Sequence, residues 1–157
     1  MTKPAIYLQE ANILDGTTNL IRLLKDPSLL ATKGYLAGEW VDGDGLQTFD
    51  VINPARGDII AQVANLSRDQ AAYAIAAAET AQKDWSAMTG KERSVILRKW
   101  FDLIIKNADD LATILTVEQG KPIAEAKGEI VYGAFFIEFF AEEAKRIYGE
   151  TIPATNA

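Results

Sequence analysis

The longest apolar segment of the chain reads EQGKPIAEAKGEIVYGAFFIEFFAEEAKRIYGETIP and covers residues 118–153. Between Ile130 and Ala141, Glu138 is the only charged residue. A helix of this composition is apolar on almost every side, so a folded protein has to cover it all round. The rest of the chain offers two amphipathic helical patterns and a few short strands, which can cover only part of it. We therefore expect the chain to be the front portion of a larger fold.

Composition restricts the possible chemistry. The net charge of −6 argues against nucleic acid and anionic membranes as partners. The chain has no histidine and no cysteine, which excludes disulfides, thiol chemistry, imidazole acid–base catalysis and zinc sites built on these residues. No apolar run reaches the ~18 residues of a membrane span. Residues 1–16 lack the apolar core of a signal peptide and carry acids, so we expect a cytoplasmic location.

Short strand patterns follow an N-terminal arm. Residues 1–16 show no clean period, and residues 18–25 predict a short helix closed by Asp26-Pro27, a pair that also suits a further helical turn through Leu30. YLAGEWV (35–41) and TFDVIN (48–53) predict two strands, with DGDG (42–45) as the turn between them. DIIAQVA (58–64) predicts a third strand after a turn at Arg56-Gly57.

Helical patterns fill the remainder of the chain. Ser67 with Gln70 and Thr89 with Glu92 match capping boxes, which predict helices over 67–87 and 90–107. Asp109-Asp110 starts a third helix that Gly120 ends, and Pro122 opens a last helix that runs to Tyr148, with Gly149 as a left-handed end residue. The first helix is expected to present a small face, and the second an inward apolar face: Ala71, Ala74, Ile75, Ala78, Ala81 and Trp85, then Val95, Ile96, Trp100, Leu103 and Ile104.

The resulting prediction is an α+β fragment, in which a small antiparallel hairpin or meander packs near three to four helices. Residues 1–33 form the arm and short helix, and residues 34–157 form one unit with strands within 35–63 and helices within 67–148.

Ordered short motifs point to a known family. They are LKDPSLL (24–30), YLAGEWV (35–41), FDVINPARGDII (49–60), EQGKP (118–122), EAKGEI (125–130) and FAEEAKRIYGETIP (140–153). In this order and spacing the chain resembles the amino-terminal part of the aldehyde dehydrogenase superfamily, most closely the NAD(P)-dependent succinate-semialdehyde dehydrogenases. The likeness covers about residues 20–153. It implies the front part of the family's α/β fold, NAD or NADP as cofactor, and oxidation of succinate semialdehyde to succinate.

The same resemblance implies what the chain lacks. The family's nucleophilic cysteine, general base, oxyanion asparagine and glycine-rich cofactor turn lie beyond the position that matches Pro153. We therefore expect a truncated chain with no catalytic or cofactor-binding residues, which is inactive and binds no cofactor alone. The resemblance transfers two minor sites: Gly128, Tyr132 and Phe136 as a wall of the substrate tunnel, and a monovalent-cation site formed by the Val51 and Ile52 carbonyls with Glu118.

A purely structural role remains an alternative for each of these six residues. As partners we expect the remainder of the dehydrogenase fold, or self-association through helix 122–148, and neither nucleic acid nor membrane. The alternative function is a stand-alone helical interaction module that binds a partner through the aromatic helix 130–141.

Overall fold

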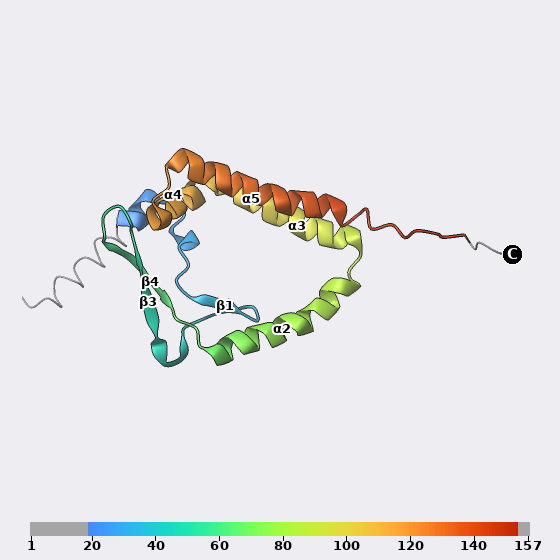
Figure 1. The fold of residues 1–157 in the computed structure, drawn as a ribbon, viewed down its shortest axis with the longest axis horizontal. Coiled ribbons are helices and arrows are strands. Elements are labelled where there is room, and N and C mark those ends of the chain that lie inside the picture. The colour runs from blue at the N-terminus through green and yellow to red at the C-terminus, as the bar shows by residue number, and fades with distance from the viewer. Residues whose placement is uncertain (1–18, 154–157) are drawn as a thin grey trace, which may run out of the picture.

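A computed structural model describes residues 19–153 of the chain. The predicted arm at residues 1–16 and the start of the predicted first helix lie outside this range. Residues 19–23 are helical and lead into a short 3-10 turn, η1 (Pro27–Leu29), which Asp26 caps by accepting the backbone N–H of Ser28. The elements that follow are β1 (Gly34–Leu36), β2 (Glu39–Val41), η2 (Asp44–Leu46), β3 (Thr48–Ile52), β4 (Ile59–Ala64), α2 (Arg68–Ala87), α3 (Gly90–Lys106), α4 (Ala108–Gln119) and α5 (Ile123–Glu143) (Figure 1).

The strands form two separate antiparallel hairpins, β1–β2 and β3–β4. The prediction of one strand over 35–41 is wrong, because the chain reverses inside it at Ala37 and Gly38, whose φ angles are 50° and 94°. Two successive positive φ angles match the twist of a two-residue hairpin turn. DGDG is therefore not a hairpin turn: it leads through η2 from one two-stranded sheet to the other.

The β3–β4 hairpin supplies the small core. Its register shifts next to Val51 and Ile52, which pair with Ala61 and Ile59, so Ile60 is an extra residue on β4. A bulge of this kind turns a strand locally. Consecutive residues of β4 are buried as a result, and Ile60 packs with Leu20 and Leu24 in the one buried cluster identified among residues 19–153.

The starts of α2 and α3 and the end of α4 agree with the sequence-based prediction. Ser67 and Thr89 form both predicted capping boxes, and Gly120 ends α4 with a φ of 81°. The last helix is shorter than predicted, since α5 ends at Glu143 instead of Tyr148. Gly149 is not among the glycines with positive φ. At this end the Ala144 carbonyl lies against Gly90, the first residue of α3, and the chain continues without regular structure.

Three helices pack together, and α5 lies along α3 and α4 (Figure 1). The buried face of α5 is made of small residues, Ala126, Ala134 and Ala141. The predicted inward face of α3 is wrong in four of its five residues, because Val95, Ile96, Trp100 and Leu103 are exposed. The less exposed positions are instead Ser94, Leu97, Phe101 and Ile104, which recur at helical spacing.

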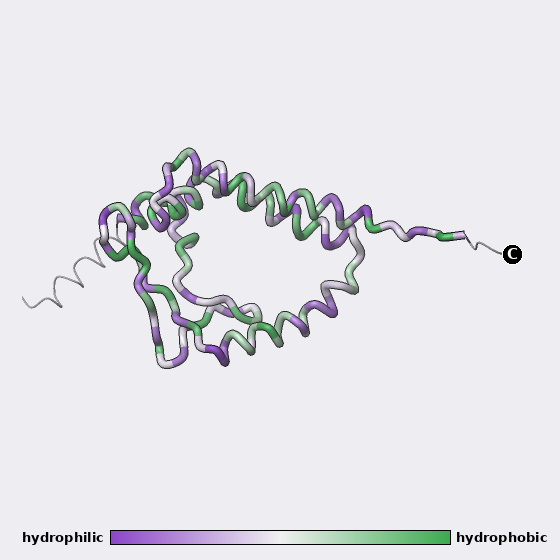
Figure 2. Tube along the Cα trace, in the orientation of Figure 1, coloured by the Kyte–Doolittle hydropathy of each residue, from purple (hydrophilic) through white to green (hydrophobic). Residues whose placement is uncertain are grey.

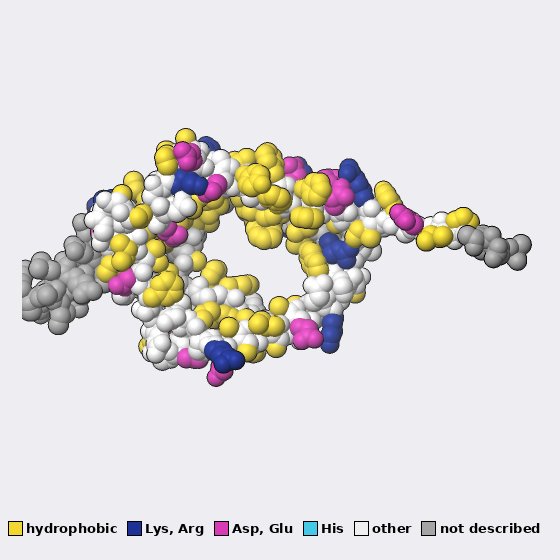
Figure 3. All heavy atoms as spheres, in the orientation of Figure 1, with side chains coloured by type: hydrophobic (Ala, Val, Ile, Leu, Met, Phe, Trp, Pro, Cys, Tyr) yellow, Lys and Arg dark blue, Asp and Glu magenta, His cyan; other side chains and the backbone are white. Residues whose placement is uncertain are grey.

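Helix α2 lies apart from this layer. Its main contact is with β1, and none of its residues is buried. The small alanine face of α2 is therefore not covered by another helix within residues 19–153. Figure 2 shows that hydrophobic positions run along α3, α5 and the middle of α2 without converging on one centre. In Figure 3 an opening separates α2 and β1 from the α3–α5 layer, with hydrophobic side chains on both sides.

Large hydrophobic side chains are accordingly exposed throughout the described chain. Twenty-four of them are exposed in residues 19–153, whereas only Leu20 and Ile60 are large and fully buried. Within the same residues, no helix combines the length and the low charge that crossing a bilayer requires.

Candidate functional site

The most apolar concave surface lies on α5. Tyr132, Phe135, Phe136, Phe139 and Phe140 line a groove of about 420 Å³. Their spacing of three and four residues places them on one stripe of the helix. This aromatic stripe lies roughly opposite the buried alanines, at about 100° of rotation per residue. The helix thus has two apolar faces. The alanine face packs against α3 and α4, and the aromatic face is exposed.

Neighbouring aromatic rings within the stripe are in contact. Tyr132 and Phe136 meet edge to face with centroids 4.9 Å apart, and Phe139 and Phe140 do the same at 5.3 Å. Gly128 precedes Tyr132 by about one turn, and a Cβ added there would meet no atom within 4 Å. The structure thus brings Tyr132 and Phe136 into contact and places Gly128 at the open end of their row. Sequence reasoning named Tyr132 and Phe136 of this groove as tunnel wall and the aromatic helix 130–141 as the partner surface of the alternative function.

The residues proposed for a cation site come from two elements that approach each other. Val51 of β3 and Val117 of α4 both pack against the Leu20, Leu24 and Ile60 cluster. Gly120, at the end of α4, lies so close to Pro54 that an added Cβ would sit 2.9 Å from its ring. These contacts bring β3, which carries Val51 and Ile52, toward the end of α4, which carries Glu118.

The environment of Glu118 differs from that of the other acids. Partial desolvation raises the pKa of its carboxyl group above the ordinary value of 4.5. Five other acids have lowered pKa values, in each case chiefly because they accept hydrogen bonds: Asp26, Asp58, Glu92, Asp109 and Glu142. Glu118 is nevertheless an exposed residue, so its carboxylate remains accessible to a dissolved cation. Residues 19–153 contain no cluster of three or more Asp and Glu side chains able to hold a metal ion.

The acids near the end of α5 are engaged in ion pairs. Glu138 accepts a 2.6 Å bond from Arg98, and Glu142 and Glu143 pair with Lys145 and Arg146. These contacts place the acids in surface ion pairs and not in an acid–base dyad.

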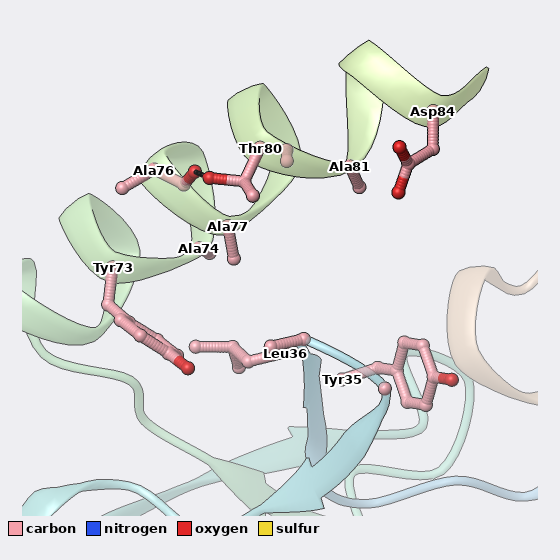
Figure 4. A pocket seen from close by; sticks show the side chains of 12 residues that line it. Tyr35, Leu36, Tyr73, Ala74, Ala76, Ala77, Thr80, Ala81 and Asp84 are labelled. Atoms are coloured by element: carbon pink, nitrogen blue, oxygen red, sulfur yellow. Dashed lines mark hydrogen bonds between the residues drawn. The ribbon is translucent and has the colours of Figure 1, made fainter. Parts of the chain in front are cut away.

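A second pocket, with a volume of about 740 Å³, lies between β1 and α2 (Figure 4). Tyr35 and Leu36 line it from β1, and Tyr73, Ala77 and Ala81 line it from α2. The sequence signal for this surface is the small alanine face of α2. The β1–β2 hairpin on the other side of this pocket was not predicted, because the turn at Ala37 and Gly38 was not recognised in the sequence.

Two acids at the start of α4 hold the N-terminal segment. The buried Asp110 carboxylate accepts the backbone N–H of Lys25 at 3.1 Å and that of Asp26 at 2.8 Å. Asp109 accepts bonds from the Lys25 and Lys127 ammonium groups. Because Lys127 belongs to α5, this cluster ties three segments together close to the proposed substrate wall. Sequence reasoning had assigned both acids only to the helix start.

Comparison with known proteins places this geometry in context. The sequence profile described as "Aldehyde dehydrogenase family" matches residues 40–157. The glutarate-semialdehyde dehydrogenase of Pseudomonas putida is 56% identical over 130 residues, which are 83% of this chain and 27% of that protein. Succinate-semialdehyde dehydrogenase [NADP(+)] GabD of Escherichia coli is 51% identical over 134 residues, 85% of this chain and 28% of that protein.

Solved structures agree. Succinate-semialdehyde dehydrogenase from Burkholderia pseudomallei superimposes with a TM-score of 0.82 at 53% identity, over 85% of this chain and 28% of that one. PnpE in complex with nicotinamide adenine dinucleotide gives a TM-score of 0.76 at 30% identity, over 81% and 26%. The chain therefore spans little more than a quarter of the length of these relatives and matches their amino-terminal portion.

Proposed function

The chain belongs to the aldehyde dehydrogenase family, and on that premise we propose that it supplies the amino-terminal portion of an NAD(P)-dependent semialdehyde dehydrogenase, with succinate semialdehyde as substrate. The observation that carries the proposal is the level of identity, 51–56%, to enzymes named for succinate and glutarate semialdehyde. Both substrates are short aliphatic aldehydes with a carboxylate at the far end. The stand-alone interaction module is not supported, because the family match runs through β3 and β4 and all four long helices.

The aromatic stripe suits the passage of such a substrate. We assign Gly128, Tyr132 and Phe136 to the wall of the substrate entrance. Moving an aliphatic chain from water to a surface of aromatic rings is favourable in free energy. Gly128 has no side chain, and no atom lies within 4 Å of where its Cβ would be, so this position does not obstruct a substrate. The basic residues beside the stripe, Arg98 and Lys121, are already paired with Glu138 and Glu129. We therefore expect residues elsewhere in the complete fold to bind the carboxylate of the substrate.

Homologues in this family bind NAD or NADP. A bound nicotinamide nucleotide supplies the hydride acceptor for aldehyde oxidation. The present residues contribute no glycine-rich turn and no thiol, so the part we assign to them is to shape the entrance and support the cofactor domain. We expect no measurable binding of NAD or NADP to this chain alone in titration calorimetry.

Val51, Ile52 and Glu118 form the second proposed site. Two backbone carbonyls and one partly desolvated carboxylate would hold a monovalent cation, which steadies the contact between β3 and α4. Replacing K⁺ by tetramethylammonium should then lower the Tm of the complete enzyme, and Glu118→Gln should abolish the difference. A cytoplasmic location belongs to the same proposal and is tested by cell fractionation.

A chimeric enzyme tests the proposed function. The 134 matching residues of this chain replace those of the Escherichia coli enzyme, and turnover is followed by NADPH absorbance with succinate semialdehyde. We expect kcat/KM within about tenfold of the parent enzyme. Phe136→Ala in the chimera should raise KM more than it lowers kcat, whereas Ile147→Ala, an equally apolar exposed change outside the stripe, should alter neither. A folded chimera without activity would contradict the proposal.

A further inference from the structure

The aromatic stripe of α5 has the properties of an interface between two copies of the chain. Its five rings are 49–64% exposed, and no described element covers them. Ridges at three- and four-residue spacing fit the grooves between the same ridges on a second helix. A stripe of this kind is self-complementary when a two-fold axis relates the two helices.

Charges beside the stripe do not oppose such pairing. Glu138, the only charged residue within its span, is held by Arg98, and Glu129 is held by Lys121 at 2.6 Å. Each copy therefore presents an apolar centre with neutralised flanks. The net charge of −6 acts only at longer range, where salt screens it.

The available area suffices for a weak dimer. A covered aromatic side chain buries about 150–250 Å², so five half-exposed rings offer roughly 400–600 Å² per copy. Two copies together bury about 800–1,200 Å², close to the lower limit of specific interfaces. Dissociation constants of weak complexes of this size fall in the micromolar range, at about 1–100 μM.

We propose that a second copy of this chain docks on the aromatic stripe, with the two α5 helices antiparallel across a two-fold axis near Phe136. In this arrangement Tyr132 of one copy lies opposite Phe140 of its partner. The dimer covers all five rings of the stripe, Tyr132 and Phe136 included. The inference rests on the exposed stripe alone and does not depend on the proposed enzymatic activity.

Sedimentation velocity over a concentration series tests the proposal. The wild-type chain should shift from monomer to dimer, and the shift should occur at lower concentration as NaCl is raised, because salt screens the net repulsion and strengthens apolar contacts. Phe136→Asp should raise the dissociation constant at least about thirtyfold, since it places one charge per copy at the axis. Ile75→Asp is the matched control: it adds the same charge at an exposed position of α2 and should leave the constant within about threefold.

Cysteine cross-linking tests the geometry independently, because the wild-type chain has no cysteine. A single Phe136→Cys chain should form a disulfide dimer under mild oxidation. Single Tyr132→Cys chains should not, but should cross-link when mixed with Phe140→Cys chains. A wild-type chain that stays monomeric at all concentrations overturns the proposal. So does association that Ile75→Asp removes and Phe136→Asp does not, with the helical circular dichroism of both variants unchanged.

Discussion

Gly120 shows how one residue joins two parts of the fold. It ends α4 at a φ of 81°, where a Cβ is strained, and an added Cβ would also press on Pro54. Gly133 offers a contrast, because it lies inside α5 with open space around its Cα.

Exchanging each glycine for alanine should therefore have opposite effects. Gly120→Ala should lower the free energy of unfolding by about 1–2 kcal/mol, because it combines left-handed strain with a steric contact. Gly133→Ala should raise it by about 0.5–1 kcal/mol through helix propensity. Urea denaturation measures both, and a loss of stability at Gly133 or a gain at Gly120 would contradict this account.

Glu118 gives a prediction with a defined pH dependence. Its folded-state pKa is raised, so the ionised carboxylate destabilises the fold above that pKa. The cost disappears as the pH falls through the folded pKa toward the unfolded value near 4.5. In buffer whose only cation is tetramethylammonium, Glu118→Gln should thus raise the Tm at pH 7 and lose this advantage at pH 4, while Glu79→Gln on the exposed surface of α2 should do neither. An equal gain for Glu118→Gln at both pH values would show that desolvation of the charge is not the cause.

At the level of elements, the helix ends were predictable and the helix faces were not. Capping boxes at Ser67 and Thr89 and the left-handed Gly120 are local chemistry, which a sequence displays directly. The choice between two apolar stripes on α3 depends on what packs against it. Here α5 selects Ser94, Leu97, Phe101 and Ile104, because its small alanine face allows a close approach.

The strands show the same division between local and non-local information. DGDG is a stronger turn signal than Ala37-Gly38, yet the hairpin forms at the weaker one, where Tyr35 and Trp40 pack edge to face across β1 and β2. The register shift that sends Ile60 into the core depends on Leu20 and Leu24, about 40 residues earlier in the chain. Of the candidate sites, the α5 row of Gly128, Tyr132 and Phe136 was named from the family resemblance, and its four-residue spacing agrees with one face of a helix. The pocket between β1 and α2 was not, because it requires the hairpin.

Helix α2 should be the least protected of the four long helices. It has no buried residue, whereas α5 buries three alanines, and a lone helix of this length is only marginally stable in water. Hydrogen–deuterium exchange measured by mass spectrometry should show amides of residues 72–87 exchanging faster than those of residues 127–141. Equal protection in both helices would mean that α2 is covered by contacts that this structure does not contain.

On the scale of the whole molecule, the chain alone should not oxidise aldehydes. It contains no cysteine to form a thiohemiacetal and no glycine-rich turn for the nucleotide. Purified protein incubated with succinate semialdehyde and NAD⁺ or NADP⁺ should give no NAD(P)H above a control without protein. Turnover that increases with protein concentration and survives a further purification step would disprove this expectation.

The opening between α2 and the α3–α5 layer is the feature that most sets this chain apart from an independent domain (Figure 3). Hydrophobic side chains line both of its sides, and each exposed aromatic side chain forgoes on the order of 2 kcal/mol of burial. Domains hold only about 5–15 kcal/mol of net stability, so we expect a fold with this many uncovered rings to depend on other residues to cover them. In the relatives, nearly three quarters of the protein lies outside the matched segment.

ANS fluorescence, measured on dilute monomeric chain and on the chimera with the Escherichia coli enzyme, tests this account most directly. The chain alone should enhance ANS fluorescence strongly, because the aromatic stripe and the walls of the opening are in water. The chimera should bring the signal down to that of the parent enzyme, since we expect the remainder of the family fold to cover the same surfaces. A monomeric chain that leaves ANS fluorescence unchanged would contradict the account, because its apolar faces would then be covered within the 157 residues.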